Sequence, residues 1–251
     1  MDDTSGAPSL VTSRTADGVV TITLDSPANR NALSRRLITE LTRAVTELTR
    51  PETVRAAVLT HTGPVFCSGA DLSETSADGV RSGLRDLLFL FRELLTRPVP
   101  IVARVDGAVR AGGLGLLGAC DIVVASTRSS FAFSEVRLGL APAIIELPLR
   151  ERLSSRARSR YFVTGETFDA AVAARIGLIT EAADDADAAL APILAALRLG
   201  SRQGLRESKR LAAAPLLRAL DEDGDAMTEL SAALFASEPA QEQMRSFLHR
   251  R

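Results

Sequence analysis

The chain has 251 residues, 46% of them hydrophobic, with 30 basic and 31 acidic side chains and a net charge of −1. This content is enough to bury one substantial core, and the even charge argues against the basic surface that nucleic-acid binding requires. The apolar runs are far shorter than the roughly 20 residues of a membrane span, and the segment from Met1 to Pro8 has no signal-peptide pattern. We therefore expect a cytoplasmic protein with neither nucleic-acid nor membrane partners.

Cysteine and histidine are too scarce for several kinds of catalytic site. Cys67 and Cys120 are the only cysteines, and His61 and His249 are the only histidines. Two cysteines so far apart predict neither a disulfide framework nor a zinc site. His61 follows a strand-like run and His249 lies at the end of the chain, so we predict that neither acts as a general base. The chemistry would then depend on carboxylates, backbone amides and a bound substrate, without a metal.

Strand and helix patterns alternate through the first half of the chain. Val11–Leu24 predicts a hairpin around Ala16-Asp17-Gly18, and Ser34 caps a predicted amphipathic helix over Arg35–Leu48. The next predicted elements are a strand at Ala56–His61, a loop at Gly63–Gly69, a mobile stretch at Ser73–Gly83, a helix at Leu84–Leu95, a strand at Pro100–Val105, a glycine-rich turn and helix at Gly107–Gly118, and strands at Asp121–Ala125 and Ser130–Phe133. This alternation predicts an α/β layered fold.

The strand pattern stops near Asp187. The predicted helices beyond it are Asp187–Leu199, Arg202–Ala213, Leu216–Phe235 and Pro239–Arg250, and Pro192 favours a later start for the first of them. We therefore predict an α/β core over residues 1–186 and a helical region over residues 187–251.

Two glycine-rich turns, Phe66–Leu72 and Gly107–Gly115, each follow a strand and lead toward a helix. Such turns leave backbone N–H groups unpaired, and small side chains let a ligand approach them. Facing each other, they could form an oxyanion hole, although plain packing glycines explain the pattern equally well. The G-x-G-x-x-G match at Gly113–Gly118 lies too far after the strand, which ends near Val105, to predict dinucleotide binding.

Five segments together resemble the crotonase superfamily, which contains the enoyl-CoA hydratases and isomerases. They are Ser26–Leu33, Phe66–Leu72, Asp106–Asp121, Phe133–Pro142, and Thr164–Glu166 with Ala173–Leu178. The resemblance implies a spiral of strand–strand–helix (ββα) turns and a C-terminal helical region that builds homotrimers or dimers of trimers. It also implies an acyl-CoA substrate, with coenzyme A entering as part of the thioester and no permanently bound cofactor.

The resemblance also implies roles for particular residues. The amides of Ala70 and Gly112 would form the oxyanion hole, and Glu135 would be the acid–base group. The coenzyme A path would contain Asn29, Arg30, Ser68, Asp71 and Leu72, with Lys209, the only lysine, near the phosphates. Phe247 would either cover the ligand or belong to the core.

One departure from the family pattern concerns the chemistry. Family hydratases use two glutamates, and Gly115 stands where the first would be. A single carboxylate is enough to move a double bond, so the preferred interpretation is Δ3,Δ2-enoyl-CoA isomerisation by Glu135. The alternatives are a hydratase with a rearranged acid–base set and a non-catalytic acyl-CoA-binding protein.

Three further residues near this site are unusual for the family. Glu146 could supply a second carboxylate to a rearranged hydratase site, or it could pair with Arg150, four residues on. Ser134 replaces a usual proline before Glu135, and Arg110 within the glycine turn has no assigned role.

Overall fold

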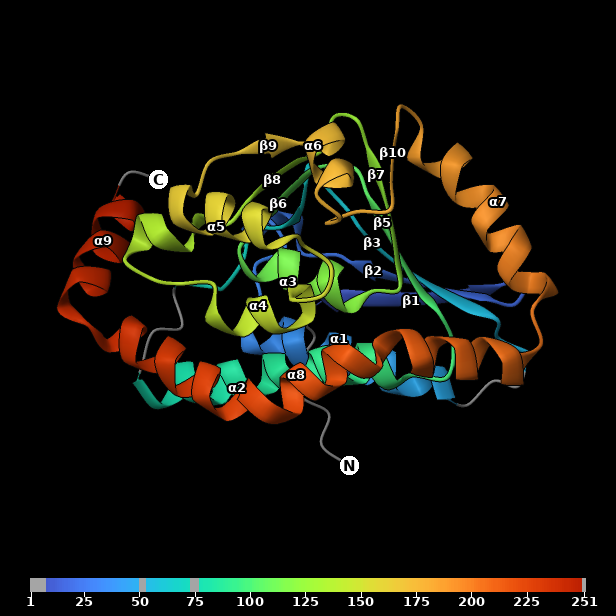
Figure 1. Cartoon of the computed structure of the whole chain (residues 1–251), viewed down its shortest axis with the longest axis horizontal. Coiled ribbons are helices and arrows are strands. Elements are labelled where there is room, and N and C mark those ends of the chain that lie inside the picture. The colour runs from blue at the N-terminus through green and yellow to red at the C-terminus, as the bar shows by residue number, and fades with distance from the viewer. Residues whose placement is uncertain (1–7, 50–52, 73–76, 250–251) are drawn as a thin grey trace.

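Two sheets lie at the centre of the computed structural model, which describes residues 8–49, 53–72 and 77–249 (Figure 1). The larger has six strands in the order β1 (Val11–Ala16), β2 (Val19–Leu24), β3 (Ala56–His61), β5 (Ile101–Val105), β7 (Ile122–Ser126) and β10 (Glu181–Ala183). The smaller has four, in the order β4 (Val65–Cys67), β6 (Ala108–Arg110), β8 (Ser130–Ala132) and β9 (Phe168–Asp169). Apart from the antiparallel pairs β1–β2 and β8–β9, neighbouring strands are parallel.

Successive strands alternate between the two sheets before a helix follows. A strand of the large sheet is followed by a short strand of the small one, as in β3–β4, β5–β6 and β7–β8. The first two pairs are followed by α2 (Ala77–Thr96) and α3 (Gly112–Ala119). The predicted α/β fold, a spiral of ββα turns with a C-terminal helical region, is therefore confirmed.

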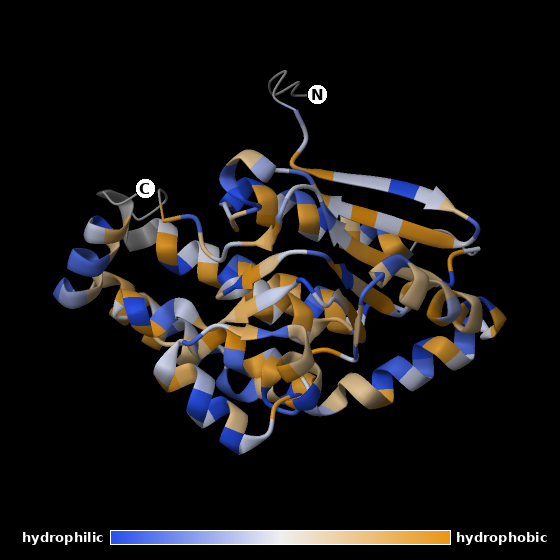
Figure 2. Ribbon diagram, turned by 90° about the horizontal axis from the view of Figure 1, so that it is seen from above, coloured by the Kyte–Doolittle hydropathy of each residue, from blue (hydrophilic) through white to orange (hydrophobic). Residues whose placement is uncertain are grey.

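The helices cover both sheets. They are α1 (Arg35–Thr46), α2, α3, α4 (Ala143–Leu149), α5 (Ser155–Thr164), α6 (Ala170–Arg175), α7 (Ala186–Leu199), α8 (Arg202–Ala236) and α9 (Glu238–His249), with short 3-10 turns η1 (Pro27–Asn29), η2 (Glu47–Thr49) and η3 (Ser134–Leu138). Every residue of α3 is buried, as expected of a helix that is apolar on all sides. Figure 2 shows hydrophobic residues concentrated on the central elements and hydrophilic ones along the outer helices.

The C-terminal helices pack directly on the spiral. α8 lies alongside α2 and α4 (Figure 1), and its buried residues Ala213, Leu216 and Leu220 belong to the main hydrophobic core. α7 covers the other face of the large sheet, where Leu190 packs with Val58 and neighbouring strand residues. The change from strands to helices thus falls at Ala186, but the two regions share their cores. Within the described residues, no helix is both long and apolar enough to cross a membrane.

Several predicted boundaries are wrong. α2 begins at Ala77, well before Leu84, so most of the segment predicted to be mobile is helical, and residues 73–76 lie outside the described part. α8 continues through Pro215 as one helix, and α7 begins at Ala186 despite Pro192. Packing of buried residues on both sides of Pro215 outweighs the roughly 3 kcal/mol that an interior proline costs.

Candidate active site

A cavity of about 1020 Å³ opens where the small sheet, α2, α3, η3 and the C-terminal helices meet. Its wall contains nearly all of the residues predicted for the site, namely Asn29, Arg30, Ser68, Ala70, Asp71, Leu72, Gly112, Glu135 and Phe247. These residues come from segments more than 200 positions apart, and the fold brings them to one cavity.

Asn31 fixes the loop that carries Asn29 and Arg30. Its fully buried side chain accepts a hydrogen bond from the Ser26 amide (2.8 Å) and donates to the carbonyls of Thr62 (3.1 Å) and Val65 (2.8 Å). Asn31 has φ of +51°, in the left-handed region that asparagine tolerates better than most residues. Sequence reasoning missed this residue, although an Asn in a Pro-Ala-Asn-Arg-Asn turn was the available signal.

The amide of Ala70 points into the cavity because its peptide plane is fixed from the other side. The Gly69 carbonyl accepts a hydrogen bond from the Leu33 amide at 2.8 Å. In a trans peptide the C=O and N–H groups point in opposite directions, so the Ala70 N–H is directed away from Leu33. Among the described residues it has no hydrogen-bond acceptor.

The amide of Gly112 is oriented in the same way at the start of α3. The Ala111 carbonyl accepts from the Leu114 amide at 2.8 Å, within the helix, so the Gly112 N–H points outward from the helix end. Within the described part of the chain this amide also lacks an acceptor. Ala111 has φ of +48°, a strained conformation for a residue with a Cβ.

The two turns approach each other closely at Gly69. A Cβ at Gly69 would lie 2.8 Å from the Ala111 Cβ and 3.6 Å from the Gly112 nitrogen, so only glycine fits there. Gly69 also has φ of +91°, which favours glycine. Two unpaired amides on facing turns can stabilise a negatively charged oxygen.

Glu135 lies on η3 and is 8% exposed. Among the described residues its Oε2 atom has no hydrogen-bond partner. Burial raises the pKa of this carboxyl group to about 7, although a hydrogen bond from its own backbone amide opposes the shift. Phe133, which directly precedes η3, packs against Phe162 and Phe168, which anchors η3. A carboxyl group that exchanges its proton near neutral pH suits acid–base catalysis.

Gly115 stands where family hydratases have their first glutamate, and the side chains of Phe91 and Ile145 fill the space beside it. A Cβ on Gly115 would lie 2.5 Å from the Phe91 Cζ atom and 3.1 Å from the Ile145 Cγ2 atom. Phe91 is fully buried, so its ring has little room to move. This wall of the site is therefore closed and apolar.

Glu146 does not line the cavity, so its suggested role as a second carboxylate is wrong. It pairs with Arg150, the other alternative raised by the sequence, at 2.7 Å, and also with Arg158 at 2.6 Å. Arg150 continues the network to Asp223 on α8. These ion pairs join α4, α5 and α8.

Lys209 also requires a correction, because it is absent from the cavity wall and only 5% exposed. Its Nζ atom donates to the carbonyls of Leu94 (2.7 Å) and Val99 (3.1 Å) and forms an ion pair with Asp121 at 2.8 Å. The ammonium group is thus engaged inside the protein, where it links α8 to the end of α2 and to the segment that joins α2 and β5.

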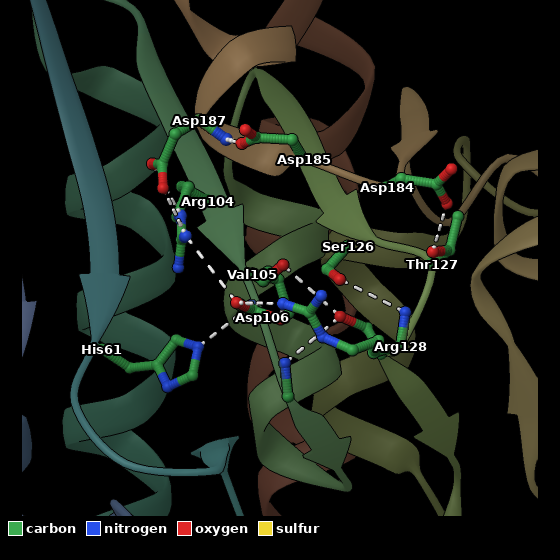
Figure 3. Close-up of polar contacts among 12 residues, drawn as sticks. His61, Arg104, Val105, Asp106, Ser126, Thr127, Arg128, Asp184, Asp185 and Asp187 are labelled. Atoms are coloured by element: carbon green, nitrogen blue, oxygen red, sulfur yellow. Dashed lines mark hydrogen bonds and ion pairs between the residues drawn. The ribbon is translucent and has the colours of Figure 1, made fainter.

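His61 belongs to a polar cluster outside the cavity wall (Figure 3). Its Nε2 atom accepts from the Asp106 amide at 3.1 Å, and the Asp106 carboxylate binds Arg128 at 2.9 Å. Arg104 pairs with Asp187 at 2.6 Å. Burial lowers the pKa of His61. Within the described residues, no group of three or more potential metal ligands gathers at one place.

Comparisons with known proteins show the family of this chain. A family model described as "Enoyl-CoA hydratase/isomerase" matches residues 14–251. The chain belongs to this family, which is part of the crotonase superfamily. Among solved structures, a putative enoyl-CoA hydratase from Mycobacterium avium paratuberculosis K-10 is 47% identical, with a TM-score of 0.92, covering 96% of this chain and 97% of that chain. An enoyl-CoA hydratase from Mycobacterium avium is 45% identical, with a TM-score of 0.91 and coverage of 98% of both chains.

Curated relatives of the enoyl-CoA hydratase/isomerase family match over shorter stretches. Rat "Enoyl-CoA hydratase domain-containing protein 3, mitochondrial" is 35% identical over 181 residues, which are 69% of this chain and 59% of that protein. A putative enoyl-CoA hydratase from Thermus thermophilus is 33% identical over 171 residues, 66% of this chain and 68% of that protein. The match therefore spans about three fifths of the rat relative's length.

Proposed function

We propose that the protein is a Δ3,Δ2-enoyl-CoA isomerase. The observation that carries the proposal is the buried Glu135 carboxyl group, which lines the same cavity as the unpaired amides of Ala70 and Gly112. Its pKa of about 7 leaves a substantial fraction ionised and a substantial fraction protonated at neutral pH. One group can therefore both remove and return a proton.

The reaction begins when the thioester oxygen of a 3-enoyl-CoA accepts hydrogen bonds from Ala70 and Gly112. The Glu135 carboxylate removes a proton from C2, and the C–H electron pair forms the C1–C2 double bond of a dienolate. The negative charge on oxygen is stabilised by the two amides. The Glu135 carboxylic acid then protonates C4, which restores the thioester carbonyl and leaves the double bond between C2 and C3.

The cavity wall accommodates both parts of such a substrate. Polar residues of the two loops at one side, Asn29, Arg30, Ser68 and Asp71, would contact the coenzyme A portion. Apolar residues from α2, α4 and α8 would surround the acyl chain, namely Val80, Leu84, Leu87, Ile144, Ile145 and Phe235. A largely apolar wall also excludes water from the dienolate.

Hydration of an enoyl-CoA would require a second acid–base group at this site. Adding water to an enoyl thioester needs a base for the water and an acid for C2, and losing one of two cooperating groups removes roughly 10² to 10⁴ of the rate. Gly115 supplies no carboxylate, and Glu146 is occupied by Arg150 and Arg158.

The test uses trans-3-hexenoyl-CoA and crotonyl-CoA with the purified protein. We expect conjugated-enoyl absorbance to appear from the first substrate and to persist with the second. The Glu135→Gln variant should lose at least ~10²-fold in turnover and keep its affinity for butyryl-CoA. The matched control is Glu146→Gln, which alters a carboxylate outside the cavity and should isomerise at the wild-type rate.

Three results would contradict the proposal. Rapid loss of crotonyl-CoA absorbance would identify a hydratase. Wild-type turnover by the Glu135→Gln variant would remove Glu135 from the chemistry, and inactivity on both substrates with intact butyryl-CoA binding would favour an acyl-CoA-binding protein.

A further inference from the structure

Arg110 is a half-buried cation that lines the cavity. It ends β6, two residues before the oxyanion amide of Gly112, and its side chain lines the cavity. The guanidinium donates through Nη1 to the carbonyls of Val109 (2.9 Å) and Ser130 (2.6 Å), and through Nη2 to the Ser130 hydroxyl (3.0 Å). These bonds fix the position of the guanidinium on the small sheet.

The bonding leaves part of Arg110 available to a ligand. A guanidinium has five N–H donors, and these three contacts use three of them. Among the described residues the remaining two donors, including Nε–H, have no acceptor. The three groups that Arg110 binds are neutral, so its positive charge is not compensated there.

A second arginine lines the same cavity. Arg137 lies on η3, two residues after Glu135, and also lines the cavity. The pKa of Arg110 is lowered, first by its burial and then by repulsion from the Arg137 cation. Among the described residues, neither arginine pairs with a carboxylate. Two neighbouring cations on a cavity wall repel each other, and an anion between them would relieve that repulsion.

We propose that Arg110 and Arg137 form an anion subsite that binds an oxyanionic group of the thioester ligand. The proposal rests on the proposed function for the identity of that ligand as an acyl-CoA. Planar guanidinium groups match carboxylate and phosphate oxygens, and such charge-assisted hydrogen bonds are the strong ones. Arg110 is held in place before the ligand arrives, so less entropy is lost on binding.

Two parts of an acyl-CoA could supply the anion, namely a carboxylate at the far end of the acyl chain and a phosphate of the coenzyme A portion. Three unreactive ligands separate them. Butyryl-CoA has the phosphates only, glutaryl-CoA adds a terminal carboxylate to the same chain, and butyryl-pantetheine has neither.

The experiment measures the Kd of each ligand by calorimetry for the wild type and for Arg110→Gln, Arg137→Gln and Arg110→Lys. Both Gln variants should weaken binding of the anion-bearing ligand roughly tenfold or more, and Arg110→Lys should recover part of the loss. If the anion is a phosphate, both CoA ligands lose affinity equally. If it is a carboxylate, only glutaryl-CoA does. Butyryl-pantetheine should bind every variant alike, and the exposed Arg156→Gln serves as the matched charge control.

The proposal is overturned if all three ligands bind Arg137→Gln and Arg110→Lys as they bind the wild type. Arg137 is exposed, so its variant tests the subsite even where Arg110→Gln fails to fold. A wild-type protein that binds no acyl-CoA at all would overturn the proposed function as well, which distinguishes the two failures.

Discussion

Burial of Glu135 lets its carboxyl group exchange a proton near neutral pH, and it also lowers the stability of the folded protein. Its carboxyl group is buried among apolar residues, which disfavours the charged form and raises the pKa from the ordinary 4.5 to about 7. Between these two values the native state binds more protons than the unfolded state. The stability contribution of Glu135 is therefore fully present below pH 4.5 and is lost as the pH rises through 7.

The Glu135→Gln variant tests this linkage, because glutamine is similar in shape and never ionises. We expect the variant to be more stable than the wild type at pH 8, by up to about 3 kcal/mol for a shift of this size. The difference should vanish near pH 4.5. Urea unfolding at both pH values measures it, and an equal gain at the two values would contradict the assigned pKa.

Gly115 has no room for a side chain, because buried neighbours fill the space beside it. We expect Gly115→Ala to destabilise the protein by about 1–3 kcal/mol, because its Cβ would collide with the buried ring of Phe91. Phe91→Leu in the same chain should recover part of this loss, as residues in contact are not additive. Gly83→Ala is the control, since a Cβ there meets nothing within 4 Å and helix propensity favours alanine by about 1 kcal/mol. Thermal unfolding of these variants and of the Phe91→Leu single variant would measure the coupling, and strict additivity would contradict it.

At the scale of elements, Lys209 and Asp121 tie the long helix α8 to the spiral. The Asp121 carboxylate accepts a hydrogen bond from the Ile101 amide at 2.7 Å and also binds the Lys209 ammonium, so the residue directly before β7 connects β5 to α8. The Leu94 carbonyl that Lys209 binds lies in the last turn of α2, where a cation is favoured by the helix dipole.

Replacing Lys209 should lower the free energy of unfolding and leave the affinity for the ligand unchanged. We expect Lys209→Met to lose about 3–5 kcal/mol, because Asp121 would remain largely buried without its partner. Arg206→Met, at an exposed position of the same helix, should stay within about 0.5 kcal/mol of the wild type. Denaturant unfolding gives the stability and butyryl-CoA titration the affinity. A large loss of affinity in folded Lys209→Met would restore the expected coenzyme A contact.

At the scale of the whole molecule, residues from the first strand to α8 share one hydrophobic core. Two buried thiols can be used to follow the unfolding of this core at two places, because Cys67 lies in β4 and Cys120 directly follows α3. Burial raises the pKa of both thiols to about 12.

We expect neither thiol to react with a disulfide reagent at pH 8 in the native protein, because a buried neutral thiol is a poor nucleophile. In urea both thiols should become reactive over the same range of urea concentration. The midpoint of this change should coincide with the midpoint of the far-UV circular dichroism transition. Cys67→Ala and Cys120→Ala variants assign the two reactions. Exposure of one thiol before the other would show that the two parts of the core unfold separately.

Local patterns predicted a large part of this fold. Alternation and helical periodicity located β2, β3, α1 and the helical C-terminal region, because each is long enough to display its period, although α8 was predicted as two helices. The strands β4 and β6, at three residues each, are too short to show one. Glu135, Ala70 and Gly112 could be predicted as site residues because they lie within motifs whose spacing along the chain is local information, and all three line the cavity.

The sequence by itself determined the family, the α/β spiral and, apart from Lys209, the predicted site residues that meet in the cavity. Only the tertiary structure decided the partners of individual charges, namely that Lys209 pairs with Asp121, Glu146 with Arg158, and Arg110 with no carboxylate among the described residues. It also decided that Phe91 closes the space beside Gly115. The physical reason is that propensity and periodicity depend on near neighbours in the chain, whereas ion pairing and packing depend on residues that only folding brings together.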